Sequence, residues 1–170
     1  MNKVYFAGKF NLIKNNNLTL EERLKNDFRS KLLGSSKLLT FYQDNLLINN
    51  KYQYLGPFYC EQASLGNFTS TDCNVVLNSE LKSVRDCDIY VGVFGENFSV
   101  GTIVELGWAL NLNKKIIILY KEEDSIYEIK SEYWFAIADA LSRSKNIEVF
   151  KYKNDDEIVK IINRKLDKYA

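Results

Sequence analysis

The stretch SVGTIVELGWA, residues 99–109, decides the fold because an apolar run lies on each side of it. Residues 89–94 (IYVGVF) precede it and residues 115–120 (KIIILY) follow it, and both have the continuous apolar character of strands in a parallel sheet. The stretch between them is predicted to turn at Gly101 and continue as a helix. This arrangement places Glu105 near the carboxyl ends of the strands, where open α/β sheets bind ligands and where the amino end of a helix raises the local positive potential.

Strands and helices alternate along the rest of the chain. Strands are predicted at residues 4–7, 38–42, 89–94, 115–120 and 147–152, and helices at 20–32, 71–84, 101–111, 127–142 and 155–169. Thr19 is placed to cap the first helix, Gly34 to end it, and Asn113 to end the third in a left-handed conformation. This order predicts an α/β fold, a doubly wound parallel sheet of about five strands with flanking helices, in a single domain spanning residues 1–170.

Residues 43–71 are less regular. Two extended pieces, 46–48 and 52–60, lie around a pair of asparagines at 49 and 50, and Gly56–Pro57 interrupts the second piece. We interpret this segment as an insertion near the carboxyl edge of the sheet, the alternative being a surface hairpin without chemistry.

The helix that begins at Thr71 carries apolar residues at helical spacing. They are predicted to form its buried stripe: Val75, Val76, Leu77, Leu81 and Val84. Glu80 falls between them and is predicted to point toward the strand ends, the alternative being a solvated helix position.

The composition excludes several functional classes. The chain has 170 residues, 46% of them hydrophobic and 26% charged, which is typical of a folded domain. Its formal net charge of +1 gives no broad basic field for nucleic acid or a membrane surface. Histidine is absent, so Ser-His-Asp catalysis, imidazole metal sites and histidine proton shuttles are excluded. Acid–base or nucleophilic catalysis would therefore have to use carboxylates, Tyr, Lys or Cys.

The remaining sequence signals are negative. The three cysteines, Cys60, Cys73 and Cys87, are odd in number and lack CxxC spacing, so neither structural disulfides nor zinc is expected. No segment approaches the ~18 apolar residues of a membrane span, and residues 1–8 run directly into a strand without a signal peptide. We therefore expect a cytoplasmic protein. No phosphate-loop, GxGxxG or GxSxG motif follows any strand.

The Glu105 carboxylate, close to the predicted turn, remains as the candidate catalytic group. A Glu in a crevice can attack the anomeric carbon of a sugar and form a covalent glycosyl intermediate. Such a nucleophile should be ionised, and we expect the amino end of the helix to keep the Glu105 carboxylate in its ionised form. A nearby phenol, such as that of Tyr5 at the end of the first strand, could hold the carboxylate by a hydrogen bond. The alternative is that Glu105 is an ordinary exposed helix residue.

Four segments carry a resemblance to a known family. GTIVELGWA at 101–109, followed by NKKI at 113–116, resembles the signature of the nucleoside 2-deoxyribosyltransferase superfamily. ELKSVRDCDI at 80–89, VYFAG at 4–8 and YLGPF at 54–58 resemble further segments of that family, and are weaker signals alone. Together the similarity covers residues 3–120.

The resemblance implies a flavodoxin-like fold and assigns roles to residues. Glu105 would attack C1′ of the deoxyribose and expel the base, Tyr5 would orient Glu105, and Glu80 would contact the sugar or assist proton transfer to the base. The expected substrate contacts are Gly8, Lys9, Asp72, Ser99, Gly101 and Thr102. No metal and no organic cofactor is implied.

Two positions depart from the family pattern. Glu80 replaces the usual Asp, which adds one methylene to a positioned carboxylate. Ser99 stands where many transferases have Asp, and this resembles the branch that hydrolyses nucleoside 5′-monophosphates. There the Ser99 hydroxyl can donate to a phosphate, and Lys9 could supply a cation. The alternative for Ser99 is a simple cap of the following helix.

These observations predict an enzyme that cleaves the N-glycosidic bond of a (deoxy)nucleoside through a glycosyl–Glu105 intermediate and transfers the sugar to another base. One alternative is an N-glycosidase that hydrolyses nucleoside 5′-monophosphates. Another is a non-catalytic nucleotide-binding or sensing module. The expected partners are a nucleoside or nucleotide and a purine or pyrimidine base, with no nucleic acid and no membrane. The family further implies a homo-oligomer whose subunits complete each other's sites, with Asp139 as the nearest candidate contributor.

Overall fold

The computed structural model describes residues 1–59, 70–95, 100–121 and 131–169, without the side chains of residues 70–73 and 131–135. Its centre is one sheet with the strand order β2-β3-β1-β4-β5-β6. The strands are β1 (Asn2–Ala7), β2 (Leu47–Ile48), β3 (Tyr52–Tyr54), β4 (Ile89–Phe94), β5 (Lys115–Lys121) and β6 (Ile147–Tyr152). Neighbouring strands pair in parallel except β2, which is antiparallel to β3.

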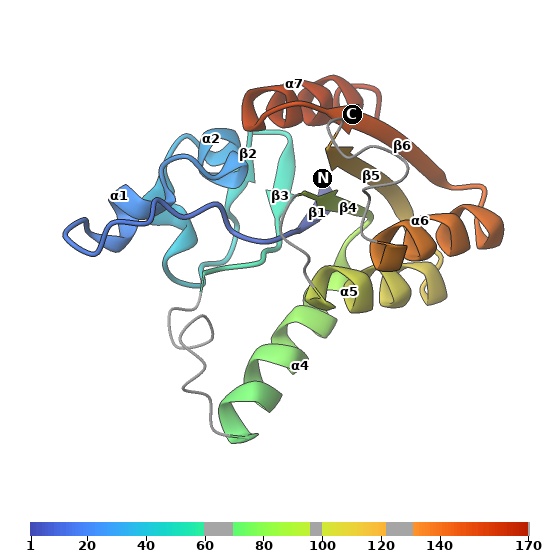
Figure 1. Ribbon diagram of the computed structural model, residues 1–170, viewed down its shortest axis with the longest axis horizontal. Helices are drawn as coiled ribbons and strands as arrows, with labels where there is room; N and C mark the ends of the chain where they lie inside the picture. Colours follow the sequence, from blue (N-terminus) through green and yellow to red (C-terminus); the bar gives the residue numbers. More distant parts are fainter. Residues whose placement is uncertain (60–69, 96–99, 122–130, 170) are drawn as a thin grey trace.

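Helices cover both faces of this sheet (Figure 1). They are α1 (Leu20–Leu24), α2 (Phe28–Leu33), η1 (Ser36–Leu39), α4 (Ser70–Asp86), α5 (Val100–Asn111), α6 (Ser131–Arg143) and α7 (Asp155–Leu166). Alternate residues of β1 divide between two cores, because successive side chains of a strand point to opposite faces. Phe6 joins the core under α1, α2 and α7, whereas Tyr5 and Ala7 join the core under α4, α5 and α6. The predicted α/β flavodoxin-like fold is confirmed.

The sheet differs from the prediction at one edge. Residues 38–42, predicted as a strand, include the end of the 3-10 helix η1, where the amide and hydroxyl of Thr40 both donate to the carbonyl of Lys37. The edge strands come instead from the segment interpreted as an insertion. Asn49 and Asn50 adopt left-handed backbone conformations, with φ of 50° and 56°, and turn β2 back into β3. In the described part of the chain the sheet therefore has six strands. Two of them, β2 and β3, are too short for a strand periodicity to be recognised in the sequence.

The first predicted helix is two helices. Thr19 caps α1 through a reciprocal capping box with Glu22. The chain then becomes extended at Asp27, whose carboxylate accepts the amide of Arg29 and caps α2. The predicted left-handed ends at Gly34 (φ 72°) and Asn113 (φ 53°) are confirmed.

Helix α4 does not bury the stripe that its sequence predicts. Val84 near its carboxyl end is fully buried, but Val75, Leu77 and Leu81 are 64%, 46% and 37% exposed. Figure 1 shows why: the helix extends beyond the sheet, so only its last turns lie against the core. Its apolar residues therefore form an exposed surface.

Candidate active site

The buried contact between Tyr5 and Glu105 is the centre of the candidate site. Tyr5 lies on central strand β1 and points to the face covered by α5, and its hydroxyl donates to Oε1 of Glu105 over 2.5 Å. Glu105 is only 6% exposed. The alternative prediction of an exposed helix residue is therefore wrong, and the expected contact with the Tyr5 phenol is present.

Tyr90 and Gly56 fix the position of the Tyr5 ring. The ring of Tyr90, on the adjacent strand β4, stacks on that of Tyr5 with centroids 6.2 Å apart. The Tyr90 hydroxyl donates to the carbonyl oxygen of Thr102 over 3.0 Å, which ties the first turn of α5 to β4. Gly56 lies against the Tyr5 ring, since a Cβ there would be 3.5 Å from Cε2 of Tyr5. The phenol therefore has little freedom to leave the carboxylate.

Burial dominates the protonation of Glu105. It raises the pKa of this carboxyl to about 8, while the hydrogen bond from Tyr5 acts in the opposite direction. The prediction that the helix end keeps Glu105 ionised is therefore wrong, because burial outweighs it. The physical reason is position, because Glu105 lies five residues after α5 begins and the field of a helix end falls off within its first turn.

Glu80 lies close enough to act on the same pair. Burial raises the pKa of its half-buried carboxyl, and its charge raises the pKa of both Glu105 and Tyr5. Two neighbouring carboxyls of this kind titrate as a coupled pair, so that one charge on the pair disfavours a second. The arrangement therefore favours a single negative charge on the two carboxyls together.

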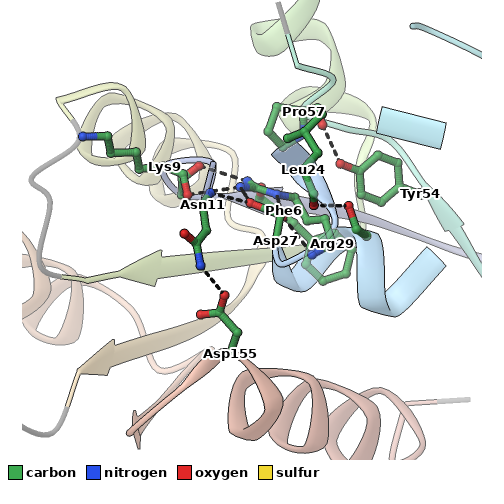
Figure 2. A network of polar contacts seen from close by, with 11 residues as sticks. Phe6, Lys9, Asn11, Leu24, Asp27, Arg29, Tyr54, Pro57 and Asp155 are labelled. Carbon is green, nitrogen blue, oxygen red and sulfur yellow. Dashed lines mark hydrogen bonds and ion pairs between the residues drawn. The ribbon is translucent and has the colours of Figure 1, made fainter. Parts of the chain in front are cut away.

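A buried arginine network supports the carboxyl end of β1 and was not predicted from the sequence (Figure 2). Arg29 is completely buried and donates to the carbonyl oxygens of Phe6, Gly8 and Lys9 at 2.9–3.2 Å. Its Nε and Nη2 each lie 2.8 Å from the carboxylate oxygens of Asp27. No local signal marked it, because Asp27 and Arg29 leave the apolar spacing of the predicted helix unbroken.

The same network orders the loop after β1. The second oxygen of the Asp27 carboxylate also accepts the amide of Asn11 over 2.8 Å, and the Arg29 guanidinium lies 3.8 Å from the centroid of the Phe10 ring. Gly8 has a φ of 145°, and a Cβ there would meet the carbonyl oxygen of Val93 at 3.0 Å. The turn at Gly8 is therefore both conformationally and sterically restricted to glycine.

The other predicted substrate contacts are only partly described. Lys9 is exposed after the Gly8 turn. Gly101 is an exposed residue of the first turn of α5, not a turn before it, and Thr102 is buried. Ser99 lies outside the described residues, as does the side chain of Asp72. The structure therefore brings Tyr5, Glu80 and Glu105 together and leaves the proposed phosphate contact at Ser99 untested.

The described part of the chain has neither a metal-binding cluster nor a membrane-spanning helix. Among those residues, no group of three or more acidic or cysteine side chains is placed to hold a metal ion. None of the helices seen there has both the length and the apolar character to cross a membrane. Asp139, the candidate for completing a neighbouring site, is exposed on α6 and pairs with Arg143 over 3.1 Å.

Comparison with known structures identifies a similar fold. The CMP N-glycosidase BcmB of Clostridium botulinum is 17% identical to this chain with a TM-score of 0.55, and the similarity covers 95% of this chain and 98% of that one. A conserved protein from Enterococcus faecalis V583 is 14% identical with a TM-score of 0.45, over 97% and 99% of the two chains. No protein-family model and no curated protein matches the sequence.

Proposed function

We propose that this protein is a nucleotide N-glycosidase that hydrolyses the bond between the base and the sugar of a nucleoside 5′-monophosphate. The observation that carries the proposal is the buried Tyr5–Glu105 contact with Glu80 beside it. The shared fold with a CMP N-glycosidase supports the reaction class. The sequence resemblance to nucleoside deoxyribosyltransferases supports the same bond as the target.

In the proposed mechanism Glu105 is the nucleophile. Its ionised carboxylate attacks C1′, the bond from C1′ to the base nitrogen breaks, and the electron pair of that bond stays on the base. Glu80 acts in its protonated form, which the burial of its carboxyl favours, and donates a proton to the leaving base. Water then attacks C1′ of the glycosyl–Glu105 ester and releases the sugar phosphate, while the Glu80 carboxylate takes the proton from that water.

Tyr5 is a positioning residue for the nucleophile in this proposal. Its hydroxyl stabilises the ionised form of Glu105 and fixes the direction of the attacking oxygen. Lys9 and Ser99 are the proposed contacts of the 5′-phosphate. A serine at 99 brings no negative charge that would repel this phosphate, which favours hydrolysis of nucleotides over sugar transfer between nucleosides.

The test is release of free base from nucleoside and deoxynucleoside 5′-monophosphates, measured by chromatography, with and without a second free base. Release of base and sugar phosphate is the expected result, and incorporation of the second base would instead establish a transferase. Glu105→Gln should lower the rate at least roughly a thousandfold because the amide cannot form the ester. Glu21→Gln, an exposed carboxyl on α1, is the matched control. Undiminished turnover by Glu105→Gln would rule out the mechanism.

We further propose that the protein is a homo-oligomer. The exposed apolar side chains Val75, Leu77 and Leu81 of α4 lie on the helix that carries Glu80, and Val104 of α5 is 42% exposed one residue before Glu105. A second copy of the chain on this surface would bury it and exclude water from the carboxyl pair.

A further inference from the structure

A second feature of the carboxyl edge lies on the opposite face of the sheet from Glu105. It is a cleft of about 1150 Å³ between the loop after β1, helices α1 and α2, and the amino end of α7. Val93 and Gly95 at the end of β4 and Tyr152 at the end of β6 lie along its inner wall. Tyr5, Glu80 and Glu105 do not line it, so it lies apart from the carboxyl pair and shares only Lys9 with the proposed substrate contacts.

The lining of this cleft is strongly cationic. Among the residues that the structure describes, the lining holds one carboxylate and six cations, which are Lys9, Lys14, Arg23, Lys31, Lys121 and Lys153. That carboxylate, on Asp155, accepts the side-chain amide of Asn11 over 2.7 Å (Figure 2). Lys31 pairs with Asp156 on the rim over 2.7 Å. Since the whole chain carries a net charge of only +1, this positive charge is concentrated locally and gives the cleft a positive potential.

Neutral groups in the lining favour the same kind of ligand. The side chains of Asn15, Asn16 and Asn26 supply amide donors. Figure 2 shows the Lys9 side chain extending away from the Arg29–Asp27 network. The buried Asp27 carboxylate therefore does not neutralise the charge of Lys9.

We infer that this cleft binds a small molecule that carries a chain of two or more phosphate groups, of the nucleoside polyphosphate or inorganic polyphosphate type. A single phosphate would reach only a small part of the lining, whereas linked phosphates extend along the cleft and can contact several of its cations. The cleft is also large for one phosphate, since pockets for whole drug-sized ligands measure about 300–1,000 Å³. Binding here goes beyond the proposed hydrolysis and does not depend on it.

The cleft and the candidate active site meet at the turn after β1. Arg29 holds the carbonyl oxygens of both Gly8 and Lys9, and Lys9 lines the cleft. A bound phosphate chain would therefore lie next to the loop that the proposed substrate contacts. This proximity gives the ligand a direct route to change nucleotide binding at the other face.

The test is calorimetric titration of the full chain with tripolyphosphate, ATP, CTP, AMP and inorganic phosphate at low and moderate salt. The test variant is Lys14→Gln/Lys153→Gln, and the matched control is Lys145→Gln/Lys168→Gln. The latter two exposed lysines lie next to the amino end of β6 and after the carboxyl end of α7, away from the cleft. Lys121 is left unchanged because the acidic residues 122–124 follow it in the sequence.

We expect tripolyphosphate and the triphosphates to bind more tightly than AMP or phosphate, with affinity that falls as salt rises. The test variant should bind roughly tenfold more weakly, which corresponds to the loss of about 1.4 kcal/mol, while the control binds as the unaltered protein does. Tighter binding of ATP and CTP than of tripolyphosphate identifies a nucleotide ligand, and equal binding identifies the phosphate chain alone. Failure of tripolyphosphate to bind, or an equal loss in both variants, would overturn the inference. Repeating the titration with Glu105→Gln separates this result from any failure of the hydrolysis proposal.

Discussion

The Tyr5 hydroxyl and the Glu105 carboxylate lie one hundred residues apart in the chain and form a buried hydrogen bond of 2.5 Å. The bond joins a central strand to the helix that follows the next strand of the sheet. It favours the ionised form of a carboxyl whose burial favours the neutral form, and burial prevails, with a pKa of about 8. The site therefore holds its proposed nucleophile mostly protonated at neutral pH.

The first prediction concerns the pH dependence of base release. Since attack requires the Glu105 carboxylate and departure of the base requires the Glu80 proton, kcat/KM should show a bell-shaped dependence on pH, with one of its two midpoints near the Glu105 pKa of about 8. Tyr5→Phe removes the donor that lowers this pKa, so this midpoint should move to higher pH and kcat/KM at pH 7 should fall roughly tenfold. The measurement is initial rate at low substrate concentration between pH 5.5 and about 9.5.

Tyr90→Phe provides the control for this profile. It removes a hydroxyl from the same aromatic cluster, but that hydroxyl donates to the carbonyl of Thr102 and not to Glu105. Its midpoint should match that of the unaltered enzyme even if its stability is lower. Identical midpoints for Tyr5→Phe and the unaltered enzyme would show that the Tyr5 hydroxyl does not change the pKa of Glu105.

The second prediction links Glu105 to stability. The pKa of this group rises from an ordinary value of 4.5 to about 8 on folding, so its contribution to stability is full below pH 4.5 and is lost as pH rises through 8. Glu105→Gln keeps an acceptor for Tyr5 and carries no charge. The variant should therefore match the unaltered protein at pH 4.5 and exceed it at about pH 9 by about 2 kcal/mol, or roughly 4–8 °C in Tm. If the stability difference between Glu105→Gln and the unaltered protein did not change with pH, Glu105 would not be a buried carboxyl that titrates in this range.

The order of strands and helices was predictable because each central element carries a strong local pattern. β4, β5 and β6 are continuous runs of six or seven residues, and each is followed or preceded by a clear helical period. The edge strands β2 and β3 have only two and three residues, and too short a run has no readable period. Their pairing is decided by β1 and by the turn at Asn49, which local patterns do not reveal.

The contact between Tyr5 and Glu105 was predictable from the sequence, and the charge state of Glu105 was not. The resemblance named Tyr5, Glu80 and Glu105, and the structure places the three together. The charge state of Glu105 depends on how much of its surface the fold removes from water, which one sequence does not specify. The Arg29 network was missed for a similar reason, since its partners are backbone carbonyls that any sequence could supply.

The third prediction concerns the proposed oligomer. Leu77→Glu/Leu81→Glu places charges on the exposed apolar surface of α4, where they cannot be buried against a second copy without cost. The variant should sediment as a monomer of 19.8 kDa at a concentration where the unaltered protein is larger. Leu112→Glu, also on an exposed apolar residue but at the other end of α5, should leave assembly unchanged. A monomeric unaltered protein would contradict the proposal.

The fourth prediction concerns the buried ion pair beneath the β1 turn. Asp27→Ala removes the carboxylate that neutralises Arg29, and both side chains are fully buried, so an uncompensated charge remains in the core. Breaking such a pair costs about 3–5 kcal/mol, which should lower Tm by roughly 10 °C. Lys31→Gln, on the same helix α2, breaks only the exposed pair with Asp156 and should cost less than about 1 kcal/mol. Because Arg29 also holds Gly8 and Lys9, KM for the nucleotide should rise in Asp27→Ala, even well below its Tm. If Asp27→Ala lowered the stability by the expected amount and left KM unchanged, the network would support the core and not the loop after β1.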